Sequence, residues 1–464
     1  MNVALHGIDL ILVIIYLLLT AGIGFWAGKG IKNMKDFSVA GKSYGSFVIF
    51  ATISASFIGG GYCMGNAAKA YEVGLVYSFA LLGFSVKEFF VALFIAPRMN
   101  KFPDAISVGD VIGKQFGKLA QCFTGIFAVL ICAGILGAQV GGIGLLFEQF
   151  LGMPQWIGIC VGIGIVIFYT AFGGMRAVVL TDVLQFIVLT VGVPLILILA
   201  VLHAGGLGKI VESVPPNLLA PLGGSEFPWI QFISLFFVFM LGETLVPPYF
   251  QRLLIAKDDR SRKMGTLYSG IYSIPFFLIA GALGVVAFAV DPNLEASQAM
   301  PYLINTVMPI GAKGLVIAGI IAVLMSSADS FLNAAAVSLV NDVINPFARL
   351  SDRQELRLGR WATILTGAIA VVFAFSGKGL LDILVLSYDF WSPMILTPLV
   401  AVIFGIKSSR RAFFSSAAAG CSGVFLWNRY CSETGFSGML AGIIVNLAIF
   451  SIITAIDKRK EVLA

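Results

Sequence analysis

The stretch Val323-Leu-Met-Ser-Ser-Ala-Asp-Ser-Phe-Leu-Asn333 is the most informative part of this chain, because it places three hydroxyls and a carboxylate inside a long apolar segment. On a helix, Ser326, Ser327 and Ser330 share one face, since residues three and four apart are neighbours. Asp329 lies beside that face. Hard oxygen ligands at membrane depth are costly unless they bind something, and a small dehydrated cation suits them. The stretch predicts a cation site; the alternative is serines that satisfy backbone carbonyls or let helices pack closely.

The remainder of the chain is also strongly apolar. Hydrophobic residues make up 59% of its 464 residues and charged residues 12%, which is about half the charged share of a soluble protein. Apolar runs of about 18 residues or more recur along nearly the whole length. We predict an all-α membrane protein, with residues 1–464 forming a single transmembrane domain of thirteen spans. These spans are 8–28, 45–70, 74–97, 119–147, 155–173, 178–203, 228–249, 265–290, 313–344, 361–376, 379–405, 412–430 and 437–456.

The basic residues predict the orientation, because loops rich in Lys and Arg stay in the cytoplasm. With the N-terminus outside, most of the 30 Lys and Arg residues fall on the cytoplasmic side, Arg252 among them. The C-terminus is then cytoplasmic. We predict a multi-pass plasma-membrane protein, as in a bacterial inner membrane. The net charge of +6 reflects this bias and gives no reason to expect nucleic-acid binding.

Several classes of function lack the residues that they need. The six cysteines have no metal-ligand spacing, and two histidines are too few for buried haem ligation. There is no GxxxxGK[ST] loop, so the chain does not drive transport with its own ATP. No nucleophile–base or metal constellation favours an enzyme. A passive channel would need a continuous polar stripe, whereas the ionisable residues cluster at mid-membrane and at one cytoplasmic site.

Two of the predicted spans are interrupted. The glycines of Ile58-Gly-Gly-Gly-Tyr62 cost about 1 kcal/mol each in a helix, and the prolines of Gly242-Glu-Thr-Leu-Val-Pro-Pro-Tyr249 remove backbone donors. Broken helices are tolerated in membranes where the opened backbone lines a cavity or binds a ligand. Counting five spans from each break gives two repeats, 45–203 and 228–405, which run in opposite senses because five is odd. Corresponding broken helices mark the central site of a transporter.

Four stretches, in this order, give the chain its resemblance to a known family. They are Ile58–Tyr62, Gly173-Gly-Met-Arg-Ala-Val-Val-Leu-Thr-Asp-Val-Leu-Gln185, Tyr249-Phe-Gln-Arg252 and Met325-Ser-Ser-Ala-Asp-Ser330. The chain resembles the sodium/solute symporter family along nearly its whole length, and among its members the high-affinity choline transporters. The resemblance implies a LeuT-type core of two inverted five-span repeats, with one span before and two after. It also implies Na⁺-coupled import of a small polar organic solute by alternating access.

The resemblance further implies which residues bind Na⁺. One Na⁺ would take the hydroxyls of two adjacent serines on the ninth span and three backbone carbonyls from the ninth and second spans. These residues are Ser326, Ser327, Val323, Ala51 and Ser54. A second Na⁺, nearer the cytoplasm, would be bound by the residues Asp182, Ser326, Asp329 and Ser330. The alternative for Asp182 is helix capping or a cytoplasmic salt bridge.

The residues at the solute positions depart from the choline pattern. A quaternary ammonium needs a box of aromatic faces, but Phe57 and Val246 stand where choline transporters have Trp, and all six tryptophans are expected near span ends. Three charges lie within spans instead, where charges face a cavity or pair with one another. We expect an amino acid, a carboxylate or a related zwitterion as solute. The expected solute-site residues are Phe57, Tyr62, Lys87, Glu88 and Glu243. The structural alternative is a buried Lys87–Glu88 or Lys87–Glu243 pair.

Other modes of transport remain open from the sequence. A proton-coupled carrier could use Asp182, Glu243 or Asp329. Choline, another quaternary amine or a sugar-like compound are the alternative solutes. The expected partners are the solute, Na⁺ and the lipid bilayer, with no nucleic acid and no obligate protein partner.

Overall fold

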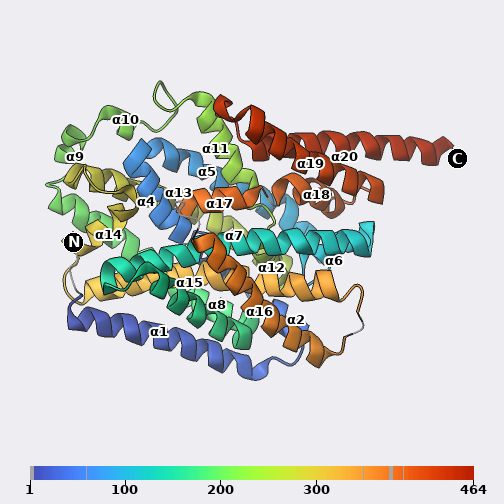
Figure 1. The fold of residues 1–464 in the computed structure, drawn as a ribbon, viewed down its shortest axis with the longest axis horizontal. Helices are drawn as coiled ribbons and strands as arrows, with labels where there is room; N and C mark the ends of the chain where they lie inside the picture. Colours follow the sequence, from blue (N-terminus) through green and yellow to red (C-terminus); the bar gives the residue numbers. More distant parts are fainter. Residues whose placement is uncertain (1–4, 59, 349, 376–379, 390, 464) are drawn as a thin grey trace.

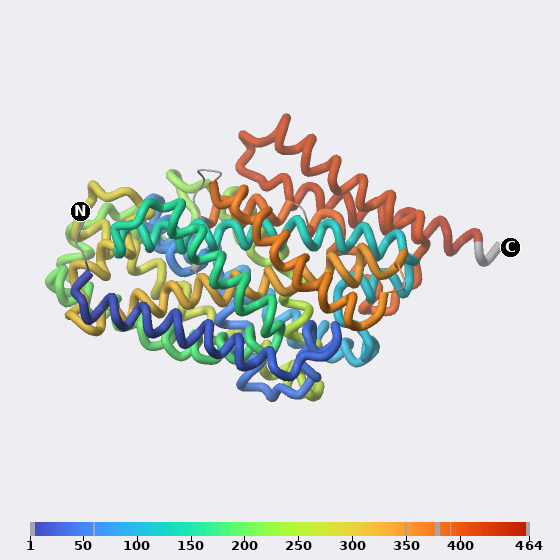
Figure 2. Tube along the Cα trace, turned by 60° about the horizontal axis from the view of Figure 1, so that its bottom comes forward, coloured from blue at the N-terminus to red at the C-terminus, as the bar shows by residue number. Residues whose placement is uncertain are grey.

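The computed structural model describes residues 5–58, 60–348, 350–375, 380–389 and 391–463. Long helices run roughly along the long axis of the molecule, and the two ends of the chain lie at opposite ends of this axis (Figure 1). The first and last long helices lie on opposite sides of the bundle (Figures 1 and 2). Such a bundle satisfies its backbone groups internally, as a bilayer requires. Gly59, Ser376, Gly379 and Phe390, which belong to predicted motifs or spans, lie outside the described residues.

In the first part of the chain, long helices occupy the predicted spans. The bounds are α1 Gly7–Ala27, α2 Met34–Val39, α3 Ser46–Phe57, α4 Gly60–Val73, α5 Leu75–Phe90, α6 Val108–Phe116, α7 Lys118–Leu151 and α8 Gln155–His203. A π-helical segment, Val91–Ile95, and a 3-10 segment, Ala96–Lys101, extend α5. The short helix α6 begins with a capping box, since Ser107 Oγ accepts from Asp110 N and the Asp110 carboxylate accepts from Ser107 N.

The second part begins with short helices in the connection between the predicted repeats. Its bounds are α9 Leu207–Ser213, α10 Pro216–Leu219, α11 Trp229–Leu241, α12 Pro247–Leu254, α13 Asp259–Val290, α14 Ala299–Val307, α15 Ala312–Ser338, α16 Asp352–Ala374, α17 Leu380–Tyr388, α18 Thr397–Ile403, α19 Arg410–Tyr430 and α20 Gly438–Leu463. π-helical segments Leu339–Ile344 and Ser392–Leu396 follow α15 and α17. Asp258 caps α13 by accepting from Ser261 N at 2.6 Å, and this bond lowers the pKa of the Asp258 carboxyl.

The number of spans differs from the prediction. Among the described residues, nine helices are long and apolar enough to cross a membrane, or ten if α3 and α4 form one bent span. Helix α8 contains two predicted spans in one element, joined at Gly174, where the backbone leaves the helical conformation (φ 48°, ψ −150°). Helix α11 has only 13 residues, and α19 is not among the nine. The count of thirteen therefore stays a prediction, whereas the all-helical membrane architecture is confirmed.

Both predicted helix breaks are confirmed. Helices α3 and α4 meet at a bend of 46°. Helix α11 ends at Leu241 and α12 begins at Pro247, because two successive prolines lack the N–H that would continue the helix. Leu245, between the two helices, has a φ of 57°, a left-handed conformation that costs a residue with a side chain about 1–2 kcal/mol. Both breaks lie among buried side chains inside the bundle.

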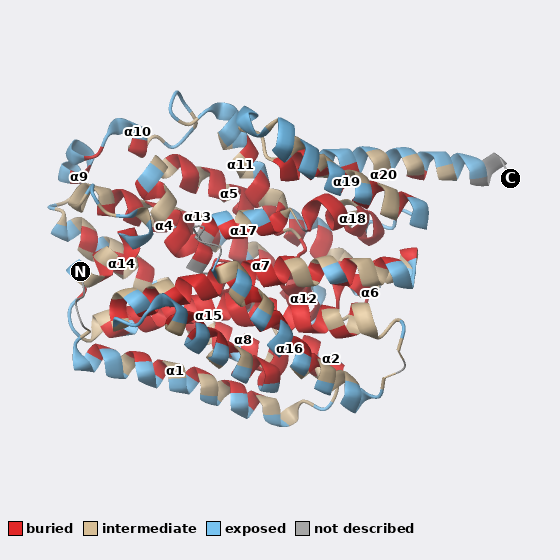
Figure 3. Ribbon diagram, in the orientation of Figure 1, coloured by how far each residue is buried: buried red, intermediate tan, exposed pale blue. Residues whose placement is uncertain are grey.

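Helix α15 forms the core of this bundle. In its most apolar window, 94% of the residues are buried. Figure 3 shows α15, α7 and α12 buried along most of their length, while α1 and α20 expose one side. Glycines let neighbouring helices approach: a Cβ on Gly83 would lie 2.0 Å from Phe236 O, and one on Gly284 2.1 Å from Ala67 O. The helix with the hydroxyl-rich motif is enclosed by α1, α3, α7, α8, α12 and α16.

Candidate functional site

The hydroxyl-rich face of α15 is turned toward α3 and α8. Its serines and its aspartate are buried. Ser327 Oγ donates a hydrogen bond of 2.7 Å to the carbonyl of Ser56, near the end of α3. Ser330 Oγ donates to Ser326 O at 2.8 Å, and Ser326 Oγ donates to the carboxylate of Asp182 on α8. The predicted face is confirmed, and it meets the interrupted helix α3.

Asp182 is surrounded by hydroxyl groups. Its side chain is fully buried on α8 and accepts hydrogen bonds from Ser326, from Thr52 and, at 3.2 Å, from Ser56 Oγ. Thr52 and Ser56 lie four residues apart on α3, so both face α8. Neither was predicted as a site residue. Because these bonds come from side chains of α3 and α15, Asp182 joins three helices and does not cap one.

Arg252, on α12, completes this cluster. Its Nη2 atom lies 3.2 Å from Asp182 Oδ2 and donates to Ser56 Oγ at 3.0 Å and to Ser330 Oγ. Among the described residues, Arg252 Nε has no hydrogen-bond partner. Arg252 was predicted among the basic residues of the cytoplasmic side; the structure buries its side chain completely in the protein, and the side of the membrane stays a prediction. The cause is the proline break, which turns α12 into the protein core, where a loop was expected.

Asp329 lies on the neighbouring flank of α15. It accepts hydrogen bonds from Tyr169 Oη at 2.8 Å, from Thr181 Oγ1 at 3.4 Å and from Ser330 Oγ at 3.2 Å. Ser330 Oγ therefore contacts both Asp329 and Arg252, and it connects the two carboxylates. Two carboxylates and one guanidinium leave the cluster one formal negative charge, which a single monovalent cation would balance.

The predicted Na⁺ ligands on α3, Ala51 and Ser54, have side chains that contact other helices. Ala51 packs with Ala55 and Phe186. Ser54 Oγ donates to Ser269 Oγ at 3.3 Å on α13, and the Ser54 carbonyl accepts from the backbone N of residue 58 at 2.9 Å. The α3 carbonyl that meets the α15 serines belongs to Ser56. Val323 is buried on α15, one helical turn before the serines.

A second buried charge cluster lies on α5. Lys87 Nζ is 3.0 Å from Glu88 Oε1, and both side chains are buried. The ammonium lies over the rings of Phe84 at 3.6 Å, Tyr249 at 4.6 Å and Phe57 at 5.8 Å, which is cation–π geometry. Tyr249 Oη donates to Glu88 Oε2 at 2.6 Å. Among the described residues, neither Lys87 Nζ nor Glu88 Oε1 makes a well-aligned hydrogen bond.

Glu243 lies in the break between α11 and α12, next to this cluster. It is buried, and its Oε2 atom has no hydrogen-bond partner among the described residues. Tyr62 and Tyr388 are its polar neighbours, and their hydroxyls hydrogen-bond to each other. Of the two alternative pairs, the structure contains Lys87–Glu88, whereas Glu243 lies beyond ion-pair distance of Lys87 in the described part of the chain.

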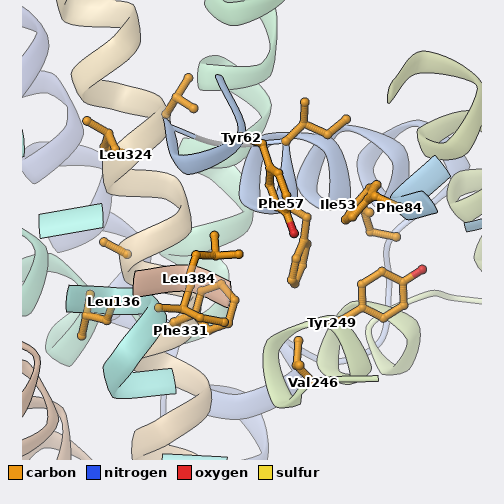
Figure 4. Packing of buried hydrophobic residues seen from close by; sticks show 14 of the residues in the cluster. Ile53, Phe57, Tyr62, Phe84, Leu136, Val246, Tyr249, Leu324, Phe331 and Leu384 are labelled. Carbon is orange, nitrogen blue, oxygen red and sulfur yellow. The ribbon is translucent and has the colours of Figure 1, made fainter. Parts of the chain in front are cut away.

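Aromatic rings line the space between the two clusters. Figure 4 shows Phe57, Tyr62 and Tyr249 projecting into the region between α3, α4 and α12. The Phe57 ring is 5.3 Å from Tyr249 and 5.7 Å from Phe331 on α15. The prediction that every tryptophan lies near a span end is wrong for Trp391, which is fully buried and donates to Thr244 O at 3.4 Å. The site is closed to solvent and carries opposite charges on an aromatic lining.

Comparisons with known proteins agree with this architecture. The model of the sodium:solute symporter family matches residues 37–420. The osmoregulated proline transporter OpuE of Bacillus subtilis (strain 168) is 24% identical over 471 residues, which cover 96% of this chain and 94% of that protein. The sodium/glucose cotransporter of Vibrio parahaemolyticus is 27% identical over 425 residues, covering 80% of this chain and 75% of that protein.

Solved structures show the same fold. A Na⁺-coupled sialic acid symporter in a substrate-bound outward-open state superposes with a TM-score of 0.81 at 21% identity, covering 96% of this chain and 98% of that chain. A nucleobase-cation-symport-1 family transporter gives a TM-score of 0.63 at 15% identity, covering 91% and 94%. The matched relatives are named as proline and sugar symporters, so the predicted closer likeness to choline transporters is not supported. The chain belongs to the sodium:solute symporter family; it is a multi-pass membrane protein of LeuT-like fold and a Na⁺-coupled solute symporter, not an enzyme.

Proposed function

We propose that this symporter imports a small zwitterion, an amino acid or a close relative of one. The observation that carries the proposal is two buried, opposite charges whose hydrogen bonding is incomplete. Among the described residues, Lys87 Nζ is ion-paired with Glu88 but makes no well-aligned hydrogen bond, and Glu243 Oε2 has no hydrogen-bond partner. A solute carboxylate would satisfy Lys87, and a solute ammonium would satisfy Glu243. Leaving buried polar groups unpaired costs about 1–3 kcal/mol each, so a ligand that pairs both gains that energy.

The spacing of the aromatic residues supports one shared pocket. Lys87 lies over Phe84, the Phe84 ring is 5.6 Å from the Tyr62 ring, and Tyr62 is a polar neighbour of Glu243. On the α12 side of this pocket, the ring of Tyr249 packs against the ring of Phe57. Relatives named as proline transporters, whose substrate is an amino acid, are consistent with such a solute. A simple carboxylate, which would pair with Lys87 only, is the weaker form of the same proposal.

The Na⁺ sites are part of this proposal. One Na⁺ would bind the hydroxyls of Ser326 and Ser327 with the Val323 carbonyl, and the contact of Ser327 with Ser56 O supports an α3 carbonyl ligand beside them. The carbonyls of Ala51 and Ser54, expected from the family resemblance, would be further ligands of this ion. A second Na⁺ would use the carboxylates and hydroxyls of the cluster described above, namely Asp182, Ser326, Asp329 and Ser330.

The proposed transport cycle uses the two repeats, 45–203 and 228–405, around these sites. We place the N-terminus outside and the C-terminus in the cytoplasm of a plasma membrane, in line with the bias of the basic residues. Each Na⁺ that enters then gains about 2.3 kcal/mol per 100 mV of membrane potential. Na⁺ that binds between α3 and α15 stabilises the helix break beside the solute pocket. Because Na⁺ then favours the state that binds solute, the Na⁺ gradient drives solute uptake.

A binding screen tests the proposed solute class. The purified protein is heated with amino acids, carboxylates, amines or sugars, in Na⁺ and in K⁺ at one fixed pH. We expect a Na⁺-dependent rise in melting temperature with one or a few amino acids, and no rise for these amino acids with the Lys87→Met/Glu88→Gln variant, which removes both charges of the pair together.

Two other results would change the assignment. Stabilisation by a neutral sugar alone would favour a sugar-like solute, for which the relationship to a sodium/glucose cotransporter is the supporting observation. Equal stabilisation in K⁺, together with proton uptake on solute binding, would favour proton coupling.

A further inference from the structure

Arg252 contacts the oxygen atoms that a second Na⁺ would need. Its Nη2 atom is within hydrogen-bond distance of Ser56 Oγ, Asp182 Oδ2 and Ser330 Oγ. Two of these three residues, Asp182 and Ser330, belong to the proposed ligands of that ion. A lone pair that accepts a guanidinium proton cannot at the same time bind a metal ion. We propose that Arg252 is a tethered cation that competes with Na⁺ for the Asp182–Ser330 site; this inference rests on the second Na⁺ site proposed above.

Electrostatics explains why the protein carries such a competitor. Asp182 and Asp329 are both fully buried, and two unbalanced carboxylates in a core would be very costly. In the Na⁺-free carrier, the guanidinium balances one of them and keeps the helices together. Arginine cannot lose its proton in proteins, so it can leave these oxygens only by moving. Na⁺ binding and the displacement of Arg252 are therefore one event.

The contacts of Arg252 suit a group that is displaced in each cycle. One of its nitrogens makes all the contacts to the cluster; Nη1 reaches only Pro248 O of its own helix at 3.4 Å, and Nε has no partner in the described residues. A guanidinium with a fixed structural role commonly uses two parallel bonds. Arg262 offers the contrast within this chain, since its Nε donates to Leu253 O at 2.6 Å and its Nη1 donates to Asp259 and to Ala96 O.

Helix α12 connects this competition to the solute pocket. Tyr249 precedes Arg252 by three residues, so both lie on one side of the helix. Tyr249 binds Glu88 and lies against Lys87, whereas Arg252 binds Asp182. A rotation or shift of α12 that withdraws Arg252 from Asp182 therefore also moves Tyr249 against the Lys87–Glu88 pair. Occupancy of the second Na⁺ site changes the shape of the solute site through this one helix.

Equilibrium binding of ²²Na⁺ to the purified carrier, without solute or transport, tests the competition. Arg252→Gln removes the competitor, and we expect the Na⁺ dissociation constant to fall by about tenfold or more, since a close charge competitor is removed. Added guanidinium chloride should reverse this gain in the variant. Arg262→Gln is the matched control for the loss of a buried arginine and should leave the Na⁺ dissociation constant near that of the wild type. Weaker or unchanged Na⁺ binding in Arg252→Gln would overturn the proposal, because it would mean that Arg252 only positions Asp182.

A second variant keeps the proposal testable if Arg252→Gln does not fold. Arg252→Gln/Asp329→Asn retains the single negative charge of the wild-type cluster, and because Asp329 is itself a proposed ligand, its Na⁺ binding is compared with that of Asp329→Asn. We expect the double variant to bind Na⁺ more tightly than Asp329→Asn; equal or weaker binding would overturn the proposal. Asp182→Asn tests the underlying site: if it leaves the number of bound Na⁺ unchanged, the second site itself is wrong, whatever Arg252 does.

Discussion

The two buried charge clusters of this carrier solve the same problem in opposite ways. Around Asp182 and Asp329, every carboxylate oxygen lies within hydrogen-bond distance of a hydroxyl. Around Lys87 and Glu243, aromatic rings surround the charges, with three tyrosine hydroxyls among them, and some charged atoms lack well-aligned bonds in the described residues. A hydroxyl can turn its lone pair to a cation, so the first cluster offers ligands that suit an ion. The second offers charges that suit a solute with its own donors and acceptors.

The largest effect should follow from removing a charge in the hydroxyl-rich cluster. Asp182→Asn leaves Arg252 buried without its partner, and breaking a buried ion pair costs about 3–5 kcal/mol. We expect a lower melting temperature and Na⁺ binding weakened about 100-fold or more. The double variant Asp182→Asn/Arg252→Gln should regain stability but not Na⁺ affinity. Wild-type Na⁺ stoichiometry in Asp182→Asn would show that the cluster is only structural.

Removing the charge of the aromatic-lined cluster should weaken solute binding and leave Na⁺ binding nearly intact. In Lys87→Met the solute carboxylate loses its ion-pair partner, a loss of about 2–3 kcal/mol, or roughly 30- to 160-fold in affinity. The measurement is solute binding at saturating Na⁺, compared with Na⁺ binding without solute. Equal losses of Na⁺ and solute affinity would contradict the assignment of solute binding to one cluster and Na⁺ binding to the other.

A smaller effect is expected where neutral ligands are removed. Ser326→Ala/Ser327→Ala deletes two hydroxyl oxygens from a site that needs about six, so Na⁺ affinity should fall about tenfold. Ser338→Ala is a suitable control, because Ser338 is buried on the same helix and lies outside the cluster. Unchanged Na⁺ dependence of uptake in the double variant would exclude both serines as ligands.

The smallest change in solute affinity is expected when a polar neighbour of Glu243 is altered. Tyr62→Phe removes one hydroxyl from the solute pocket and keeps the ring, so solute affinity should fall about fivefold, the equivalent of roughly 1 kcal/mol. Tyr77→Phe removes a hydroxyl from a ring that packs against the same Phe239 and has no role in the pocket. If both variants lose affinity equally, the effect comes from packing and not from Glu243.

Periodicity was enough to predict much of the site. The serine face of α15, the two helix breaks and the Lys87–Glu88 pair follow from spacing and residue type. The same spacing rule would have found Thr52 and Ser56, which lie four residues apart on α3. Spacing alone does not show that both hydroxyls contact Asp182 on α8 and that the Ser56 carbonyl contacts Ser327 on α15, because the phase of a helix about its axis depends on tertiary packing.

Other features depend on contacts that sequence patterns do not encode. Orientation rules treat an arginine after a span as an exposed basic residue, so they gave no sign that Arg252 is buried, although its position four residues after Pro248 was a signal. Trp391 is buried because the residues that follow α17 contact the break between α11 and α12, where Trp391 Nε1 donates to Thr244 O and Ser392 Oγ donates to Leu241 O. At Gly174 the predicted boundary between two spans is a kink inside α8, where the backbone leaves the helical conformation, so the structure has one element where two spans were predicted.

The placement of the short helix α12 has an electrical consequence. Peptide dipoles sum along a helix to partial positive charge at its N-terminus and partial negative charge at its C-terminus. Glu243 precedes the first residue of α12 by four positions, and Arg252 lies in its last turn, so each charge sits near the pole that favours it. The poles are about 12 Å apart in a core of low dielectric constant. A solute charge at one pole therefore alters the potential felt by an ion at the other before any atom of the helix has moved.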